Sequence, residues 1–173
     1  EQADIKSVLE SIKKKFKVNP FCIHTAVGTG EKFTGVIDVL SKKFHSYQKD
    51  GSGKNKTDAI PDLMTEEVNY SFGELTELVA EIDDDLTENY LESGGLSEKE
   101  FDDGFKRGLK EGKLLPVFLG SATKNVGIDL LMNSIIDYLP SPDQRGSVKG
   151  KSPKDGSEKL CNADPESSLS ALV

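Results

Sequence analysis

The chain of 173 residues contains no tryptophan, and it contains only two cysteines and two histidines. Cys22 and Cys161 are far apart in the sequence, which predicts two free thiols and neither a disulfide framework nor a cysteine-ligated metal site. The longest apolar run is only a few residues, so we expect no membrane-spanning helix and no membrane partner. The first residues lack the basic and then apolar profile of a signal peptide. Together these features predict a cytoplasmic protein.

Positive charge is scarce in one long segment. Residues 62–103 hold 15 acids and one base, Lys99, for a net charge of −14, whereas the rest of the chain holds 15 acids and 21 bases. The whole chain therefore carries −8. An acidic total argues against a sequence-specific nucleic-acid site, because phosphate contacts need a basic face. The separate acidic block predicts a basic partner or a solvated surface.

Complete nucleotide motifs are also missing. Gly51-Ser-Gly53-Lys54 lacks both the first glycine of a phosphate loop and the hydroxyl residue after the lysine, so we reject it. Asn55-Lys-Thr-Asp58 matches Asn-Lys-x-Asp, a guanine-specificity motif whose aspartate accepts two N–H bonds from guanine. No buried strand precedes it, so we interpret it as a chance match in a polar loop over residues 49–59. The acids at positions 83–85 are expected to cap a helix rather than bind a divalent ion.

Apolar spacing and capping residues predict the elements. Helices are expected over residues 5–16, for about five turns after Pro61, over 84–91, after a capping box at 97–100, and from 128 to 139. Strands are expected over residues 21–27, 33–40, 43–48 and 114–119, the last one buried on both faces. The first two of these strands should form an antiparallel hairpin. Residues 141–166 are predicted to be a linker.

The order of these elements predicts the fold class. The outer parts alternate helix, strand and helix, as in a parallel α/β sheet, whereas the middle is a hairpin followed by helices. We therefore expect an α/β fold with an inserted α+β subdomain. Gly120-Ser-Ala-Thr-Lys124 lies between the predicted buried strand and the last helix. In P-loop GTPases a Ser-Ala loop at this position offers a backbone N–H to the guanine O6.

Several segments, taken in order, resemble the elongation factor G family of translational GTPases. They are Phe33–Leu40, Ile82–Glu92, Leu96–Phe101, Leu114–Asn125 and Asp137–Pro142. The resemblance implies an internal fragment. Residues 1–16 would be the GTPase-domain helix that follows the true Asn-Lys-x-Asp motif. Residues 17–112 would be the inserted G-prime subdomain, and residues 113–139 the strand, Ser-Ala loop and C-terminal helix of the GTPase domain. Residues 140–173 would be a linker and the start of a β-barrel, with Leu169–Val173 in its first strand.

The resemblance also implies an activity for the parent protein. It would bind GTP or GDP with magnesium, hydrolyse GTP and promote ribosomal translocation. Ser121, Ala122 and Thr123 would contact guanine there. For the fragment alone we predict no catalytic residue, no metal ligand, no bound cofactor and no hydrolysis, because the phosphate loop and switch regions are not in it.

The acidic block would then contact the ribosome. The family's inserted subdomain contacts the lysine-bearing C-terminal domain of the large-subunit stalk protein, and the predicted contact residues are Glu66, Glu67, Glu74, Glu77 and Glu81. The alternative is a solvated helix face without a partner.

Other functions stay open. The segment 145–162 matches the family less closely, which leaves a paralogue acting in ribosome protection or release. A non-catalytic acidic adaptor, or one that binds guanine nucleotides through Asn55–Asp58, is a further alternative. The apolar faces of residues 1–16 and 113–139 should be exposed unless they pack on the inserted subdomain, so we expect dimerisation or loose ends where they do not pack.

Overall fold

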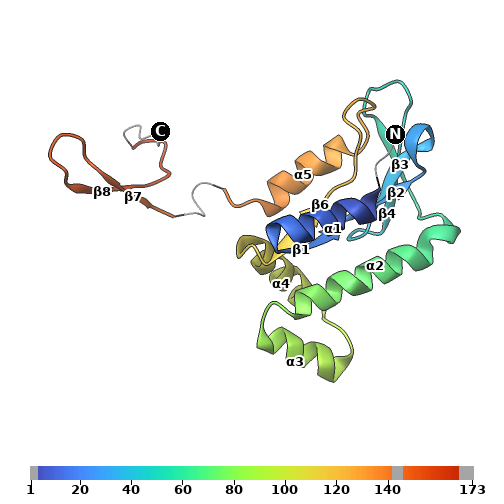
Figure 1. Cartoon of the computed structure of the whole chain (residues 1–173), viewed down its shortest axis with the longest axis horizontal. Helices are drawn as coiled ribbons and strands as arrows, with labels where there is room; N and C mark the ends of the chain where they lie inside the picture. The colour runs from blue at the N-terminus through green and yellow to red at the C-terminus, as the bar shows by residue number, and fades with distance from the viewer. Residues whose placement is uncertain (1–3, 142–145, 168–173) are drawn as a thin grey trace. The chain divides into compact units, whose positions relative to one another are not determined.

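The computed structural model describes residues 4–141 and 146–167, and the chain divides into two units, Glu1–Tyr138 and Leu139–Val173. The first unit contains, in chain order, α1 (Ile5–Phe16), β1 (Asn19–Cys22), β2 (His24–Val27), a short 3-10 turn (Gly30–Lys32), β3 (Gly35–Asp38), β4 (Lys43–Tyr47), β5 (Asn55–Asp58), α2 (Asp62–Ala80), α3 (Asp84–Ser93), α4 (Glu98–Lys110), β6 (Leu114–Val117) and α5 (Ile128–Tyr138). Figure 1 shows α3 and α4 at one end of this unit and the sheet that contains β2–β5 at the other, with α2 running between them.

The strand expected over residues 21–27 is two strands. β1 pairs in parallel with β6, whereas β2 begins an antiparallel sheet in the order β2-β3-β4-β5. Ile23 lies between them, and its N–H donates to Val117 O (3.1 Å) while its carbonyl accepts from Val39 N (2.8 Å). The division is therefore a crossing from one sheet to the other. The predicted hairpin is confirmed for β2 and β3, and the third strand for β4.

The polar loop predicted over residues 49–59 is wrong at its end. Asn55–Asp58 form the edge strand β5, with Asn55 opposite Tyr47 and Asp58 opposite Phe44. Gly51 and Gly53 have φ values of +74° and +71°, and they allow the chain to turn back sharply. The polar composition suits a strand at the exposed edge of a sheet, where side chains remain in water.

The three helices of the acidic block pack around one apolar core. Leu75 and Val79 of α2 and Phe105 of α4 are buried in it, together with Phe21 and Leu114. The predicted capping box is confirmed, because Ser97 Oγ accepts from Glu100 N and the Glu100 carboxylate accepts from Ser97 N. The helices predicted from apolar spacing therefore direct apolar side chains into a common core.

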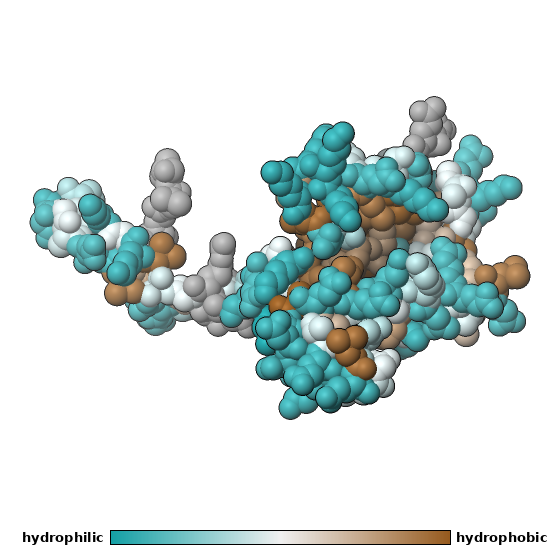
Figure 2. Space-filling model, turned by 60° about the horizontal axis from the view of Figure 1, so that its bottom comes forward, coloured by the Kyte–Doolittle hydropathy of each residue, from teal (hydrophilic) through white to brown (hydrophobic). Residues whose placement is uncertain are grey.

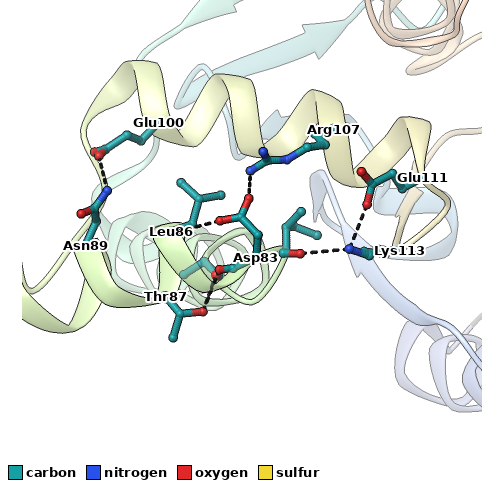
Figure 3. Close-up of polar contacts among 10 residues, drawn as sticks. Asp83, Leu86, Thr87, Asn89, Glu100, Arg107, Glu111 and Lys113 are labelled. Atoms are coloured by element: carbon teal, nitrogen blue, oxygen red, sulfur yellow. Dashed lines mark hydrogen bonds and ion pairs between the residues drawn. The ribbon is translucent and has the colours of Figure 1, made fainter.

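Polar contacts join α3 to α4, as Figure 3 shows. Asp83 caps α3 by accepting from Leu86 N (2.8 Å), and its carboxylate also pairs with Arg107 of α4. Asn89 of α3 donates to Glu100 Oε1 (2.8 Å). The predicted capping role of the first acid in the 83–85 run is thus confirmed.

The elements expected to belong to the α/β part are less buried than the helical block. In β6 only Leu114 is buried, so the prediction of a strand buried on both faces is wrong. Neither α1 nor α5 has a fully buried residue, and Phe16 and Ile136 are 68% and 76% exposed. The exposure expected for these apolar faces is confirmed for such residues, whereas Leu130 and Tyr138 of α5 pack against apolar cores of the first unit.

The second unit is more structured than a linker. β7 (Val148–Lys151) and β8 (Glu158–Cys161) form an antiparallel hairpin within the segment predicted as linker. The strand expected at 169–173 lies outside the described residues. None of the described helices is long and apolar enough to cross a membrane.

Candidate functional site: a closed Ser-Ala loop and an acidic helix face

The loop after β6 is a short, closed turn. Ser121 and Val126 exchange both backbone hydrogen bonds, from Ser121 N to Val126 O (2.9 Å) and from Val126 N to Ser121 O (3.0 Å). Asn125 adopts a left-handed conformation with φ of +53°, which asparagine tolerates well. A side chain at Gly120 would place its Cβ 2.8 Å from Val126 O, so the tight closure favours glycine there.

The structure brings the three predicted guanine-contacting residues together at the tip of this loop. Ser121 Oγ lies 3.3 Å from Thr123 Oγ1 and accepts from Lys124 N (3.4 Å). The hydrogen bonds that close the turn in the described part of the chain use the amides of Ser121, Lys124, Asn125 and Val126. They do not use those of Ala122 and Thr123, and because both residues are exposed, their N–H groups can serve a ligand.

A pocket of about 440 Å³ lies beside the loop. Its walls come from the loop, through Thr123 and Lys124, from β4, through Tyr47, and from the connections of the four-stranded sheet, through Phe33 and other residues. Burial and a hydrogen bond to Asp129 raise the pKa of Tyr47 above its ordinary value, so its hydroxyl stays protonated.

Four of the five predicted glutamates lie on one face of α2, and Glu81 continues that face as the residue that caps the C-terminal end of the helix. At about 100° of rotation per residue, they lie within an arc of about 100°, and all five are exposed. The buried residues Val68, Leu75 and Val79 lie on the other side of the helix. Because few bases interrupt this arc, its potential is negative and would attract a basic surface.

Two apolar members of the same face were not predicted from the sequence. Leu63 is 98% exposed and Tyr70 is 68% exposed, and both fall within the glutamate arc. The Tyr70 hydroxyl donates a hydrogen bond to the Glu74 carboxylate, and this bond raises the pKa of Tyr70. Leu63 and Tyr70 are seven residues apart, which is about two helical turns, so their spacing already placed both on the same side of the helix as the glutamates. The exposed tyrosine suits a protein contact, because tyrosine is enriched among the residues that contribute most to binding.

A hollow of about 560 Å³ borders the acidic face between α1 and α2. Apolar side chains including Ile5, Leu9 and Leu78 line it, while Glu74 and Glu81 stand at its α2 wall. Figure 2 shows an apolar hollow framed by hydrophilic residues on this unit. The acidic face therefore adjoins apolar surface.

The Asn55–Asp58 segment does not present a guanine site. Lys56 pairs with Asp58 Oδ1 (2.6 Å), and Asn55 donates to Asp129 Oδ2 (2.5 Å). These side chains are engaged within the protein, on an exposed edge strand. This arrangement agrees with the interpretation of a chance match.

Comparisons with known proteins show what the chain is similar to. No family model matches the chain. Elongation factor G of Thermotoga maritima is 34% identical over 172 residues, which is 99% of this chain and 25% of that protein. Nearly the whole chain is homologous to one quarter of elongation factor G. Both the Ser-Ala loop and the acidic helix face lie in the part that matches elongation factor G.

A solved structure agrees with this assignment. A crystal structure of a protein from Thermus thermophilus superposes with a TM-score of 0.71 at 28% identity, covering 84% of this chain and 22% of that one. The chain thus spans about a quarter of the length of the proteins it matches, in sequence and in structure.

Proposed function

We propose that the chain forms part of a translational GTPase of the elongation factor G type, which binds GTP and promotes ribosomal translocation in the cytoplasm. The match of 99% of the chain to elongation factor G carries this proposal. In it, residues 17–112 are the inserted subdomain, flanked by GTPase-domain segments at 1–16 and 113–139. Residues 140–173 lead into the next domain.

The loop at Ser121, Ala122 and Thr123 takes the role of guanine recognition. Its two exposed amides can donate to the guanine O6, and closure of the turn fixes their direction. Among the described residues, no group of three or more His, Cys, Asp or Glu could hold a metal ion. The role that we propose for this chain within the parent GTPase is therefore base recognition.

The acidic face of α2 takes the role of docking the ribosomal stalk protein, whose C-terminal domain carries lysines. Complementary charge mainly speeds encounter and weakens with salt. The exposed Tyr70 lies among the glutamates and supplies the kind of aromatic contact that contributes strongly to affinity, while exposed Leu63 adds apolar area at the N-terminal end of α2.

A titration with the purified stalk C-terminal domain tests the docking role. We expect binding at low salt that weakens as salt rises toward physiological strength. The double substitution Glu74→Lys, Glu77→Lys should weaken binding by about tenfold or more, because it places like charges opposite the lysines.

Glu92→Lys is the matched control, because it makes the same charge change on exposed α3, outside the α2 face. It should shift affinity only slightly. Undetectable binding at low salt, or equal weakening by the control, would contradict the docking role.

A further inference from the structure

The Ser-Ala loop is held by the four-stranded sheet through a separate apolar core. Val36 of β3 and Tyr47 of β4 are buried against Val126, which closes the loop. Phe33, Leu119 and Leu130 pack around them. Residues on both sides of the loop, at 119 and at 126–130, therefore pack against the sheet, which precedes the loop by some 80 residues in the sequence.

Polar contacts add to this core at the tip of the loop. Lys124 Nζ donates to Gly30 O (2.9 Å) and Glu31 O (3.4 Å), in the connection between β2 and β3. Asn125 Nδ2 donates to Gly51 O (3.3 Å), in the turn between β4 and β5. A Cβ at Gly53 would lie 2.5 Å from that same Nδ2, which shows how closely the turn and Asn125 approach.

Further contacts fix the two ends of the loop segment. Tyr47 Oη and Asn55 Nδ2 both donate to the Asp129 carboxylate, each at 2.5 Å, and Asp129 lies in the first turn of α5. At the other end, His24 Nδ1 lies 3.4 Å from Leu119 O. Every strand of the sheet, or a connection between its strands, thus contacts the segment that contains the loop.

We propose that the four-stranded sheet is a positioning element for the Ser121–Thr123 loop, with Lys124, Asn125 and Asp129 as its positioning residues. The ligand of the loop, guanine, rests on the proposed function, whereas the positioning itself does not. Holding the loop in its binding geometry before the ligand arrives lowers the ordering cost of recognition. The contacts at 124 and 125 come from side chains in the loop itself, so they act directly on its conformation.

Hydrogen–deuterium exchange of the full 173-residue chain tests the proposal without nucleotide. Asn125→Asp keeps the size and the left-handed tolerance of asparagine but removes the donor to Gly51 O. Lys124→Met keeps the aliphatic stem and removes the donor to Gly30 O. Each change should raise exchange in the peptide covering residues 118–127 by about fivefold, the effect of one net hydrogen bond. Exchange in α2, α3 and α4 should not change.

Asn89→Asp is the matched control, because it removes a side-chain donor of the same type, to Glu100, at a site remote from the loop. It should leave residues 118–127 unchanged. Unchanged exchange of the loop in both loop variants, or an equal rise in every segment of the chain, would overturn the positioning role.

Adding GDP to the unsubstituted chain separates the two proposals. Slower exchange at residues 121–123 that both loop variants reduce supports positioning for guanine recognition. Variant effects without any GDP protection are the result expected from the prediction that the chain alone binds no cofactor, and they support the sheet as positioning element. GDP protection would contradict that prediction.

Discussion

His24 shows how one buried side chain joins the two sheets. It is 2% exposed, its ring meets Phe118 edge-on with centroids 5.3 Å apart, and Nδ1 faces the Leu119 carbonyl. Burial lowers the pKa of the imidazole below its ordinary value. Burial favours the neutral ring, and a proton on Nδ1 lets that ring donate to Leu119 O.

The stability of the fold should fall as the medium becomes mildly acidic. Below the ordinary imidazole pKa of about 6.5, the unfolded chain gains a proton at His24 that the folded chain does not, so the free energy of unfolding decreases. Asp38 and Asp129 raise the pKa of His24 and His45 lowers it, but burial dominates. Urea denaturation at pH 7.5 and 5.5 measures this change. His24→Gln should show a smaller loss between the two values.

His45→Gln serves as the comparison, since this residue is only half-buried on β4. It should keep most of the pH dependence. An identical pH dependence in wild type and His24→Gln would contradict the assignment to His24.

At the scale of elements, the helix glycines differ in what surrounds them. A Cβ added at Gly104 of α4 would lie 2.7 Å from Leu86 Cδ1 and 2.8 Å from Val79 Cγ1. A Cβ added at Gly73 of α2 would meet nothing within 4 Å. Gly104 therefore allows α4 to approach α2 and α3 closely, whereas Gly73 only lowers the helix propensity of α2.

The same substitution at these two glycines should change stability in opposite directions. Gly73→Ala should stabilise the chain by about 0.5–1 kcal/mol, because alanine loses less backbone entropy in a helix. Gly104→Ala should destabilise it by about 1–3 kcal/mol through overpacking. Thermal or urea denaturation of both variants measures the difference. A stabilised Gly104→Ala would show that the helices can separate without cost.

The helices could be predicted because their signals are local. The apolar spacing of α2, the capping box at Ser97 and the glycine after α4 all lie within a few residues of the feature they determine. The division between β1 and β2 could not be predicted, because it depends on a hydrogen bond from Ile23 to Val117, 94 positions away. β5 was missed because its residues are polar and its pairing with β4 is set by the turn.

The candidate site, like the fold, could be predicted from the sequence only in part. Helical spacing places the α2 glutamates on one face, and the family resemblance indicates Ser121–Thr123. The contacts of Lys124, Asn125 and Asp129 with the sheet had no counterpart in the sequence, since their partners are 74–94 residues away. Only the folded chain brings these groups together.

At the scale of the whole molecule, exposed apolar residues are concentrated on two helices. Val8 and Phe16 of α1 and Met132 and Ile136 of α5 are all exposed. Surfaces of this kind tend to be covered by other protein.

The chain should therefore self-associate as its concentration rises. Sedimentation velocity should show a larger mean sedimentation coefficient at high than at low micromolar concentration. Phe16→Lys and Ile136→Lys together should suppress this increase, because charge is costly to bury in an apolar contact. Leu63→Lys, on the acidic face of α2, provides the control. Concentration-independent sedimentation of the wild type would contradict this expectation.

Pro116 limits how far such association can extend along the strand edge. In the described part of the chain, β6 pairs only with β1, and the Val117 carbonyl faces β1. Because neighbouring residues of a strand direct their backbone groups to opposite sides, the backbone nitrogen of Pro116 faces the open edge, and it carries no hydrogen. A strand from another molecule that paired with this edge would find no N–H at Pro116. One of its carbonyl groups would therefore have no hydrogen-bond donor, in the middle of a strand of only four residues. Pro116 thus disfavours the addition of further strands at this edge, and with it the growth of fibrils.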